Sequence, residues 1–209
     1  MQYETEEQQV EALKAWWAEN GRAVILGIVI GVLLIGAWMW WKSYQENKAV
    51  AASDTYSQSI EALEAGQHDK VAELFEVAKS DHAGSLYGAY TGLAAARSAV
   101  EQGSLESAAE RLDWVVDHAE LDSVGMVARV RLARVKAALG DAEAGLAALP
   151  DDYPESFTAL VEEARGDLQV TAGNNDAART AYQAALDAGN AVDANALRMK
   201  FNELATVGG

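Results

Sequence analysis

The stretch "ARGDLQVTAGNNDAARTAYQAALDAG", residues 164–189, decides the fold because small and large residues recur at fixed places around a turn. Gly166 lies seven residues before the turn glycine, Gly173. Three further members of the pattern follow at five, nine and twelve residues after Gly173: Ala178, Tyr182 and Ala185. Small residues at 166 and 178 let two helix backbones approach closely, and the tyrosine fills the space above them. The stretch therefore predicts a hairpin of two helices.

The same pattern recurs upstream in the chain. The glycines at 66, 103, 140 and 173 are 37, 37 and 33 residues apart, which is the spacing of helical-hairpin repeats. The second copy contains Ala96, Gly103, Ala108, Leu112 and Val115, and the third contains Ala133, Gly140, Gly145 and Leu149. The first copy is more degenerate, with Ser59, Gly66, Val71, Phe75 and Ala78. Because one hairpin cannot bury its apolar face alone, we expect four hairpins stacked in an all-α solenoid.

This pattern of residues resembles the tetratricopeptide repeat, in which helix A needs a small residue where helix B crosses it. Composition agrees with a helical chain, since only 2 of 209 residues are proline. Pro150 ends the third unit, and Pro154 allows a new start before the fourth. We place the repeat domain at residues 42–209.

A second feature is the apolar stretch 23–41, "AVILGIVIGVLLIGAWMWW", which has no charged residue. As a helix it would be roughly 28 Å long, close to the hydrocarbon thickness of a bilayer. A buried core helix would be shorter and apolar on one face only. A cleaved signal peptide is the other alternative, and Ala49-Val50-Ala51 has the small residues of a cleavage site. The apolar segment is too long for a signal peptide, so we expect a retained single transmembrane helix.

Several residues of this segment have candidate roles in the membrane. Trp38, Trp40 and Trp41 lie just before Lys42, where aromatic rings favour the headgroup layer, so they are candidate interface anchors. Gly27 and Gly31 form a G-x-x-x-G, a pattern of closely packed transmembrane helices, although glycines facing lipid would look the same.

Residues 1–22 predict a short amphipathic helix, with Val10, Leu13 and Trp17 on one face and Asn20-Gly21 as its C-terminal stop. Such a helix would lie on the bilayer surface or dock a soluble partner. Positive charges do not settle the orientation of the span, because Lys14 and Arg22 precede it and Lys42 and Lys48 follow it.

Charge and motifs exclude several function classes. The net charge is -16, and residues 43–209 carry 27 acidic against 13 basic side chains, so nucleic acid is not an expected partner. We expect the three histidines, His68, His82 and His118, to be solvated, because they share no metal-ligand spacing. The acidic pairs Asp151-Asp152 and Glu162-Glu163 are expected on solvated surfaces. No nucleotide-binding or hydrolase motif occurs, so we expect no enzyme, no cofactor and no metal.

One pattern favours a binding surface. Arg97 and Arg134 are 37 residues apart and each precedes its turn glycine by six residues. In tetratricopeptide repeats this position tends to face the groove, and the residues expected beside it are Tyr56, Tyr90, Leu93 and Val130. Aromatic and aliphatic walls with two cations suit a peptide that carries a carboxylate. The alternatives are that both arginines pair with acidic residues of the domain, or that the chain's own C-terminal tail, "RMKFNELATVGG", fills the groove.

The whole chain resembles the bacterial ancillary SecYEG translocon subunit family, the YfgM type. The resemblance lies in "WWAENGR" before the span, "AVILGIVIGVLLIG" within it, "WKSYQ" after it, and the degenerate repeats. It implies an inner-membrane protein with a cytoplasmic N-terminus and a periplasmic repeat domain. The first repeat is too divergent for groove residues to be transferred from the family.

The resemblance further implies several partners. They are the Sec translocon, a membrane-anchored periplasmic chaperone of the parvulin-like isomerase group, exported client proteins, and a cytoplasmic response regulator. The expected function is an adaptor that helps hand exported proteins to periplasmic chaperones. The alternative is a cytoplasm-facing, membrane-anchored repeat receptor or scaffold.

Overall fold

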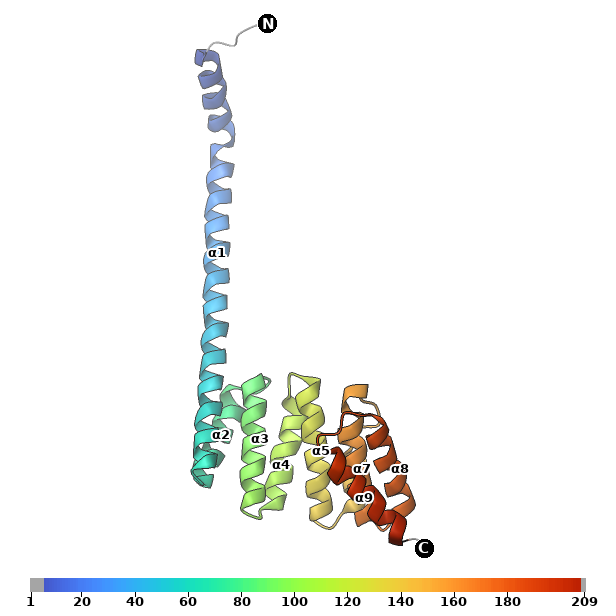
Figure 1. Cartoon of the computed structure of the whole chain (residues 1–209). Coiled ribbons are helices and arrows are strands. Elements are labelled where there is room, and N and C mark those ends of the chain that lie inside the picture. Colours follow the sequence, from blue (N-terminus) through green and yellow to red (C-terminus); the bar gives the residue numbers. More distant parts are fainter. Residues whose placement is uncertain (1–5, 208–209) are drawn as a thin grey trace. The chain divides into compact units, whose positions relative to one another are not determined.

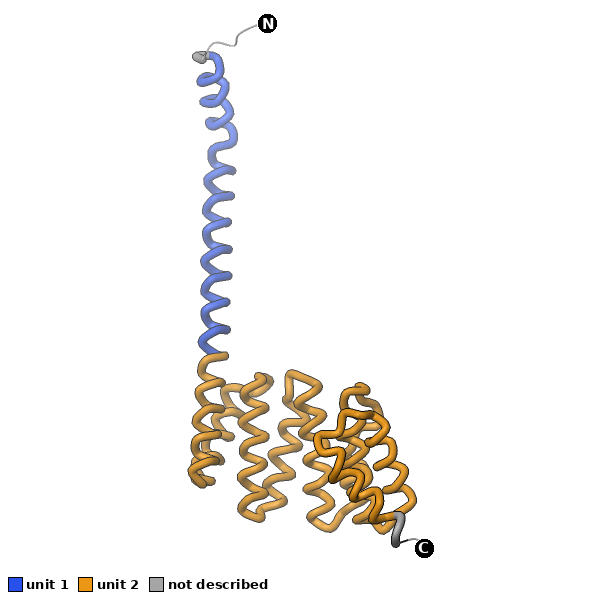
Figure 2. Tube along the Cα trace, in the orientation of Figure 1, with its two compact units in different colours: residues 1–48 blue, residues 49–209 orange. Residues whose placement is uncertain are grey.

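The structure is a computed structural model that describes residues 6–207 (Figure 1). All elements in that range are helical, which confirms the predicted all-α class. They are α1 (Glu6–Glu64), α2 (His68–Asp81), α3 (Leu86–Glu101), α4 (Leu105–His118), α5 (Asp122–Ala138), α6 (Ala142–Ala148), the 3-10 turn η1 (Glu155–Phe157), α7 (Thr158–Thr171), α8 (Asn175–Asp187) and α9 (Ala194–Val207). The chain divides into two compact units, residues 1–48 and 49–209, which Figure 2 colours separately.

The first unit consists of the N-terminal part of α1. The predicted segment 1–22 begins outside the described residues, and its predicted stop at Asn20-Gly21 is wrong because helix α1 continues through both residues. The Asn20 side chain donates a hydrogen bond to the Trp16 carbonyl, one turn earlier in the same helix, at 3.1 Å. Asn20 therefore does not end the helix. Neither residue breaks a helix as proline does, and the apolar residues that follow favour helix strongly.

The apolar segment of α1 has the properties of a membrane-spanning helix. An 18-residue window reaches a mean hydropathy of 2.5, and none of it is buried in the protein. The three candidate anchors Trp38, Trp40 and Trp41 are exposed, and Trp40 stacks on Tyr44 with 6.0 Å between ring centroids. Gly27 and Gly31 both have open space where a Cβ atom would lie. A role for these glycines in helix packing remains a prediction.

The second unit contains the four predicted hairpins. Their A helices are residues 49–64 of α1, then α3, α5 and α7, and their B helices are α2, α4, α6 and α8. Neighbouring helices pack in sequence, and α5 also contacts α7, the next A helix (Figure 1). The last helix, α9, packs on α8 and was not expected from the repeat pattern.

The four turn glycines end the A helices in the same way. Gly66, Gly103, Gly140 and Gly173 all have positive φ, between 67° and 94°, a conformation that glycine adopts at little cost. In the fourth turn, Gly173 N–H donates to the Val170 carbonyl and Asn174 N–H to the Gln169 carbonyl, at 2.9 and 2.8 Å. The same pair of hydrogen bonds occurs at the other three turns, and it defines the Schellman motif. The glycine spacing in the sequence therefore marks four identical helix ends.

Glycines allow the A helix to approach the B helix closely in the second, third and fourth hairpins. Gly166 is buried, and a Cβ atom there would clash with the ring of Tyr182, which is only 3% exposed. At Gly92 in α3 a Cβ atom would lie 2.5 Å from Val115 Cγ2 of α4, and at Gly145 in α6 it would lie 2.7 Å from the Ala133 carbonyl oxygen. These contacts confirm the small-and-large packing predicted from residues 164–189.

We expect Gly166→Ala to destabilise the repeat domain by about 1–3 kcal/mol, because the added methyl group overpacks a site whose ring cannot move freely. The matched control is Gly125→Ala, whose Cβ atom would meet Ala119 at an ordinary distance of 3.8 Å. Urea unfolding of the full chain in detergent, followed by circular dichroism, measures both changes. Equal midpoints for the two variants would contradict the close-packing role of Gly166.

Candidate functional site

A groove crosses the A helices of the first three repeats, and we call it the arginine groove. It consists of two adjoining hollows of about 250 and 260 Å³ that share Leu93, Arg97 and Arg131. The first hollow is completed by Tyr56, Ile60, Leu63, Tyr90 and Ala94. The second is completed by Ala96, Val100, Leu112, Arg134 and Val135. All of these residues belong to the second unit.

The structure brings together five of the six residues predicted to line a groove. Tyr56, Tyr90, Leu93 and Arg97 line the first hollow, and Arg97 and Arg134 both line the second. Whether these residues bind a partner remains a prediction. Their arrangement nevertheless places an aromatic end and a cationic end in one continuous depression.

Val130 requires a correction, because it does not line the groove. It is 1% exposed and lies in a core cluster with Val161, Ala164 and Leu168 of α7. Its repeat equivalent, Leu93, is 37 residues earlier and half-buried in the groove. The two positions differ because α7 packs against α5 and covers this face of it.

Three half-buried tyrosines cluster at the aromatic end, and two of them, Tyr56 and Tyr90, line the first hollow. The rings of Tyr56 and Tyr90 have centroids 5.6 Å apart, and Tyr87 lies 6.0 Å from Tyr56 and 6.4 Å from Tyr90. Such tilted and edge-on pairs stabilise one another beyond the area they bury. Tyr87 was not predicted, although its spacing of three residues from Tyr90 places both on one face of a helix.

The two predicted arginines both have carboxylate partners. Arg97 Nε donates to Glu101 Oε1 at 2.8 Å, one turn along the same helix, and 69% of the Arg97 side chain is exposed. Arg134 Nη2 lies 3.6 Å from Asp167 Oδ2 in α7. The expectation that these arginines pair within the domain is therefore met, which leaves open what else they can bind.

A third arginine, Arg131, was not singled out from the sequence. Its guanidinium has no ion pair or hydrogen bond within the described part of the chain. Partial desolvation lowers the pKa of Arg131 below the ordinary arginine value, and the positive charges of Arg134 and Arg97 lower it further. The signal that could have found it is its spacing of three residues from Arg134, which puts both on one helix face.

Asp167 stands at the position of the fourth repeat that corresponds to Arg97 and Arg134, six residues before the turn glycine. Besides Arg134, it accepts hydrogen bonds from Tyr182 Oη at 2.9 Å and from Lys200 Nζ at 2.8 Å. Burial raises the pKa of the Tyr182 hydroxyl, and the hydrogen bond to Asp167 raises it further. Burial alone would lower the pKa of Lys200, but its bonds to Asp167 and Glu163 outweigh that and raise it.

These contacts locate the C-terminal tail. Lys200 of α9 reaches α7 through Asp167 and Glu163, while Leu197 is fully buried beside Tyr182 and Ala185. The described part of the tail therefore packs on the fourth repeat, and none of its residues lines the arginine groove.

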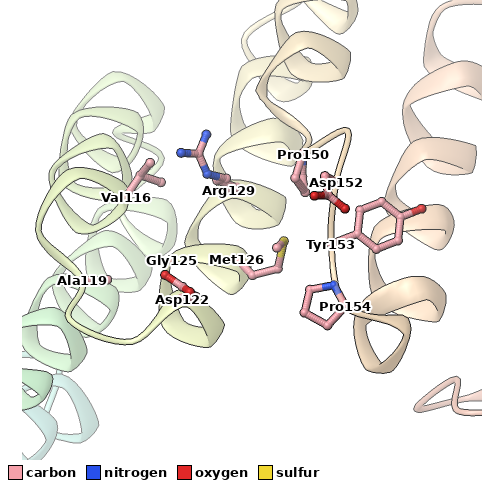
Figure 3. A pocket seen from close by; sticks show the side chains of 10 residues that line it. All are labelled: Val116, Ala119, Asp122, Gly125, Met126, Arg129, Pro150, Asp152, Tyr153 and Pro154. Carbon is pink, nitrogen blue, oxygen red and sulfur yellow. The ribbon is translucent and has the colours of Figure 1, made fainter.

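Another hollow lies elsewhere in the second unit. It has a volume of about 610 Å³ and is lined by the start of α5, the end of α4 and the loop before α7, including Met126, Arg129 and Asp152 (Figure 3). Its loop is fixed by Glu162, which accepts hydrogen bonds from Tyr153 Oη at 2.6 Å and Arg165 Nε at 3.1 Å. Burial and the bond to Glu162 raise the pKa of Tyr153. This hollow holds no set of groups that points to catalysis or to a particular ligand.

Two predictions about polar residues need correction. Glu162 and Glu163 are not on a solvated face, since their side chains are 14% and 23% exposed and both form ion pairs.

The histidines are the second case. His68 is half-buried and hydrogen-bonds to Ser98 Oγ at 2.9 Å. His82 is also half-buried and hydrogen-bonds to Thr55 Oγ1 at 3.3 Å. His118 is exposed, as predicted, and stacks on Trp114. Within residues 6–207 there is no group of His, Cys, Asp or Glu side chains that could hold a metal ion.

Comparison with known proteins agrees with this architecture. A family model described as a tetratricopeptide repeat-like domain matches residues 14–206. An ancillary SecYEG translocon subunit of Escherichia coli K12 is 32% identical over 204 residues, which cover 97% of this chain and 98% of the relative. The chain belongs to the ancillary SecYEG translocon subunit family.

Two further members of the family are similar over almost their whole length. The ancillary SecYEG translocon subunits of Haemophilus influenzae Rd and Aggregatibacter actinomycetemcomitans are each 27% identical over 199 residues, or 95% of this chain and 97% of the relative. Among solved structures, none matches the chain significantly. The similarity therefore covers the apolar helix as well as the repeats. A translocon subunit and a tetratricopeptide repeat-like domain are both non-enzymatic kinds of protein.

The correction at Val130 leads to a prediction. We expect Val130→Ala to lower the free energy of unfolding by about 2 kcal/mol, because it removes buried methyl groups from the packing of α5 against α7. Val100→Ala is the control, since Val100 lines the groove and is 45% exposed, and we expect it to change stability by less than about 0.5 kcal/mol. Urea denaturation measures both changes. An equally small effect of Val130→Ala would contradict the assignment of Val130 to the core between α5 and α7.

Proposed function

We propose that this chain is a single-pass inner-membrane adaptor of the Sec translocon. In this proposal its repeat domain lies in the periplasm and helps hand newly exported proteins to periplasmic chaperones. The observation that carries the proposal is the union, in one chain, of an unburied apolar helix with a repeat domain that has an open groove. Three full-length relatives named as translocon subunits support the translocon as the partner.

The two units suit two different kinds of contact. No other atom of the chain lies within 4 Å of the Cβ positions of Gly27 and Gly31. A translocon helix could therefore approach the apolar helix closely at these glycines within the bilayer. The repeat domain exposes tyrosine and arginine side chains in its groove, and these residue types dominate the binding energy of many protein interfaces. We therefore assign translocon contact to the span, and assign chaperone or client contact to the repeats.

The chaperone partner in this proposal is membrane-anchored and belongs to the parvulin-like isomerase group. The N-terminal segment would remain in the cytoplasm, where a response regulator is a further proposed partner. No covalent chemistry is needed for such a role, because an α-solenoid acts through the surface it offers.

A truncated chain that ends at Tyr44 should test the division of roles. We expect it to lose co-purification of the periplasmic chaperone and to retain part of its co-purification with the translocon from mild detergent, because the span is intact. The matched variant keeps residues 42–209 and replaces residues 23–41 by an unrelated span of equal length. Full translocon association of that second variant would contradict the role given to the span.

Orientation has its own test. We expect a phosphatase fused after Gly209, active only when exported, to be active in cells, and a fusion partner active only in the cytoplasm to be inactive. The flanking charges do not decide this outcome, since two basic residues lie on each side of the span. The reverse pattern of activity would favour the alternative, a cytoplasm-facing repeat receptor.

A further inference from the structure

The arginine groove has a cationic centre at Arg131, whose side chain is exposed to solvent. Arg131 lines both hollows and has neither an ion pair nor a hydrogen bond within the described residues. Two other arginines, Arg97 and Arg134, line the same groove. Partial desolvation lowers the pKa of Arg131, and repulsion from Arg134 and Arg97 lowers it further. An anion bound among the three would relieve this repulsion and accept charge-assisted hydrogen bonds from Arg131.

The partners of the two flanking arginines can be given up at little cost. The Arg97–Glu101 pair is exposed and lies within one helix, and such pairs contribute little to stability. Arg134 is 3.6 Å from Asp167, a long separation, whereas Tyr182 and Lys200 are 2.9 and 2.8 Å from the same carboxylate. Asp167 therefore stays satisfied when Arg134 turns toward a ligand.

The other end of the groove favours an apolar contact. Tyr56 and Tyr90 pack with ring centroids 5.6 Å apart, and both are half-buried beside Leu93. Rigid aromatic side chains contribute contact area at a low entropy cost, which is why they anchor peptides so often. A ligand that matches the whole groove therefore combines an anionic group with an aromatic or aliphatic group.

We propose that the arginine groove binds a protein segment bearing a carboxylate, with Arg131 as the anchor and Arg97 and Arg134 closing on the same group. An aromatic or aliphatic side chain of the segment occupies the tyrosine end. This inference rests on the proposed function, because the segment belongs to a chaperone or client that the adaptor holds.

A protein segment fits the groove better than an anionic bilayer does. Residues 43–209 carry 27 acidic against 13 basic side chains, so the domain as a whole repels a negatively charged membrane surface. Three arginines within an acidic surface instead select one small anionic group at a defined place. Arginine suits a carboxylate because its planar fork donates two parallel hydrogen bonds.

The test uses the full chain in nanodiscs of zwitterionic lipid and a displayed library of random decapeptides. We expect the wild-type protein to select peptides with an acidic residue or a free carboxyl end near an aromatic or aliphatic residue. A selected peptide should bind about tenfold or more tightly than its twin with Gln in place of Glu, as charge-assisted hydrogen bonds are strong. Arg131→Gln should reduce this ratio to about one, and Arg131→Lys should give an intermediate ratio.

Arg129→Gln is the matched control, since Arg129 is exposed on the same helix but lines the separate hollow of Figure 3. It changes the net charge equally and should keep the tenfold ratio. Three outcomes would overturn the inference: selection without acidic preference, equal loss in Arg129→Gln and Arg131→Gln, or binding of phosphatidylglycerol vesicles that depends on Arg131 without any acidic preference among peptides. Translocon and chaperone co-purification are measured separately, so the adaptor role can stand when this peptide preference fails.

Discussion

The close approach of two helices within each hairpin is the constraint on which the rest of the molecule depends. It requires a small residue at the crossing, which is glycine at positions 92, 145 and 166, and a partner that fills the space beside it. A glycine in the left-handed conformation then ends each A helix and reverses the chain. Once these two conditions repeat at regular spacing, the A helices form one layer, and residues at equivalent positions of successive repeats become neighbours.

The groove follows from that layering together with a few charges. Position six before the turn glycine is Arg97, Arg134 and then Asp167, so a run of positive charge ends at a carboxylate. Asp167 connects four helices, because it meets Arg134 of α5, Tyr182 of α8 and Lys200 of α9 from its own place in α7. The fourth repeat is thereby closed by its own ion pairs, while the first three keep an open surface.

Repeats and span could be predicted from the sequence because each depends on local patterns, the glycine spacing and the uninterrupted apolar run. The groove was only partly predictable. Val130 was assigned to it because repeats were treated as equivalent, yet α7 covers that face of α5. Arg131 was missed because its significance comes from having no ion-pair partner among the described residues, which depends on where every nearby carboxylate lies. His68, His82 and Glu162 likewise found partners from sequence-distant or tightly packed segments that spacing does not reveal.

Helix α9 covers the C-terminal end of the hairpin stack. A stack of hairpins ends in an apolar face that invites another stack, which is how repeat arrays become filaments. Here Leu197 packs that face against Tyr182 and Ala185, and the exposed residues of α9 include the polar Asn195, Arg198 and Asn202 as well as Met199. Covering the apolar end of the stack in this way removes the surface on which a further hairpin would pack.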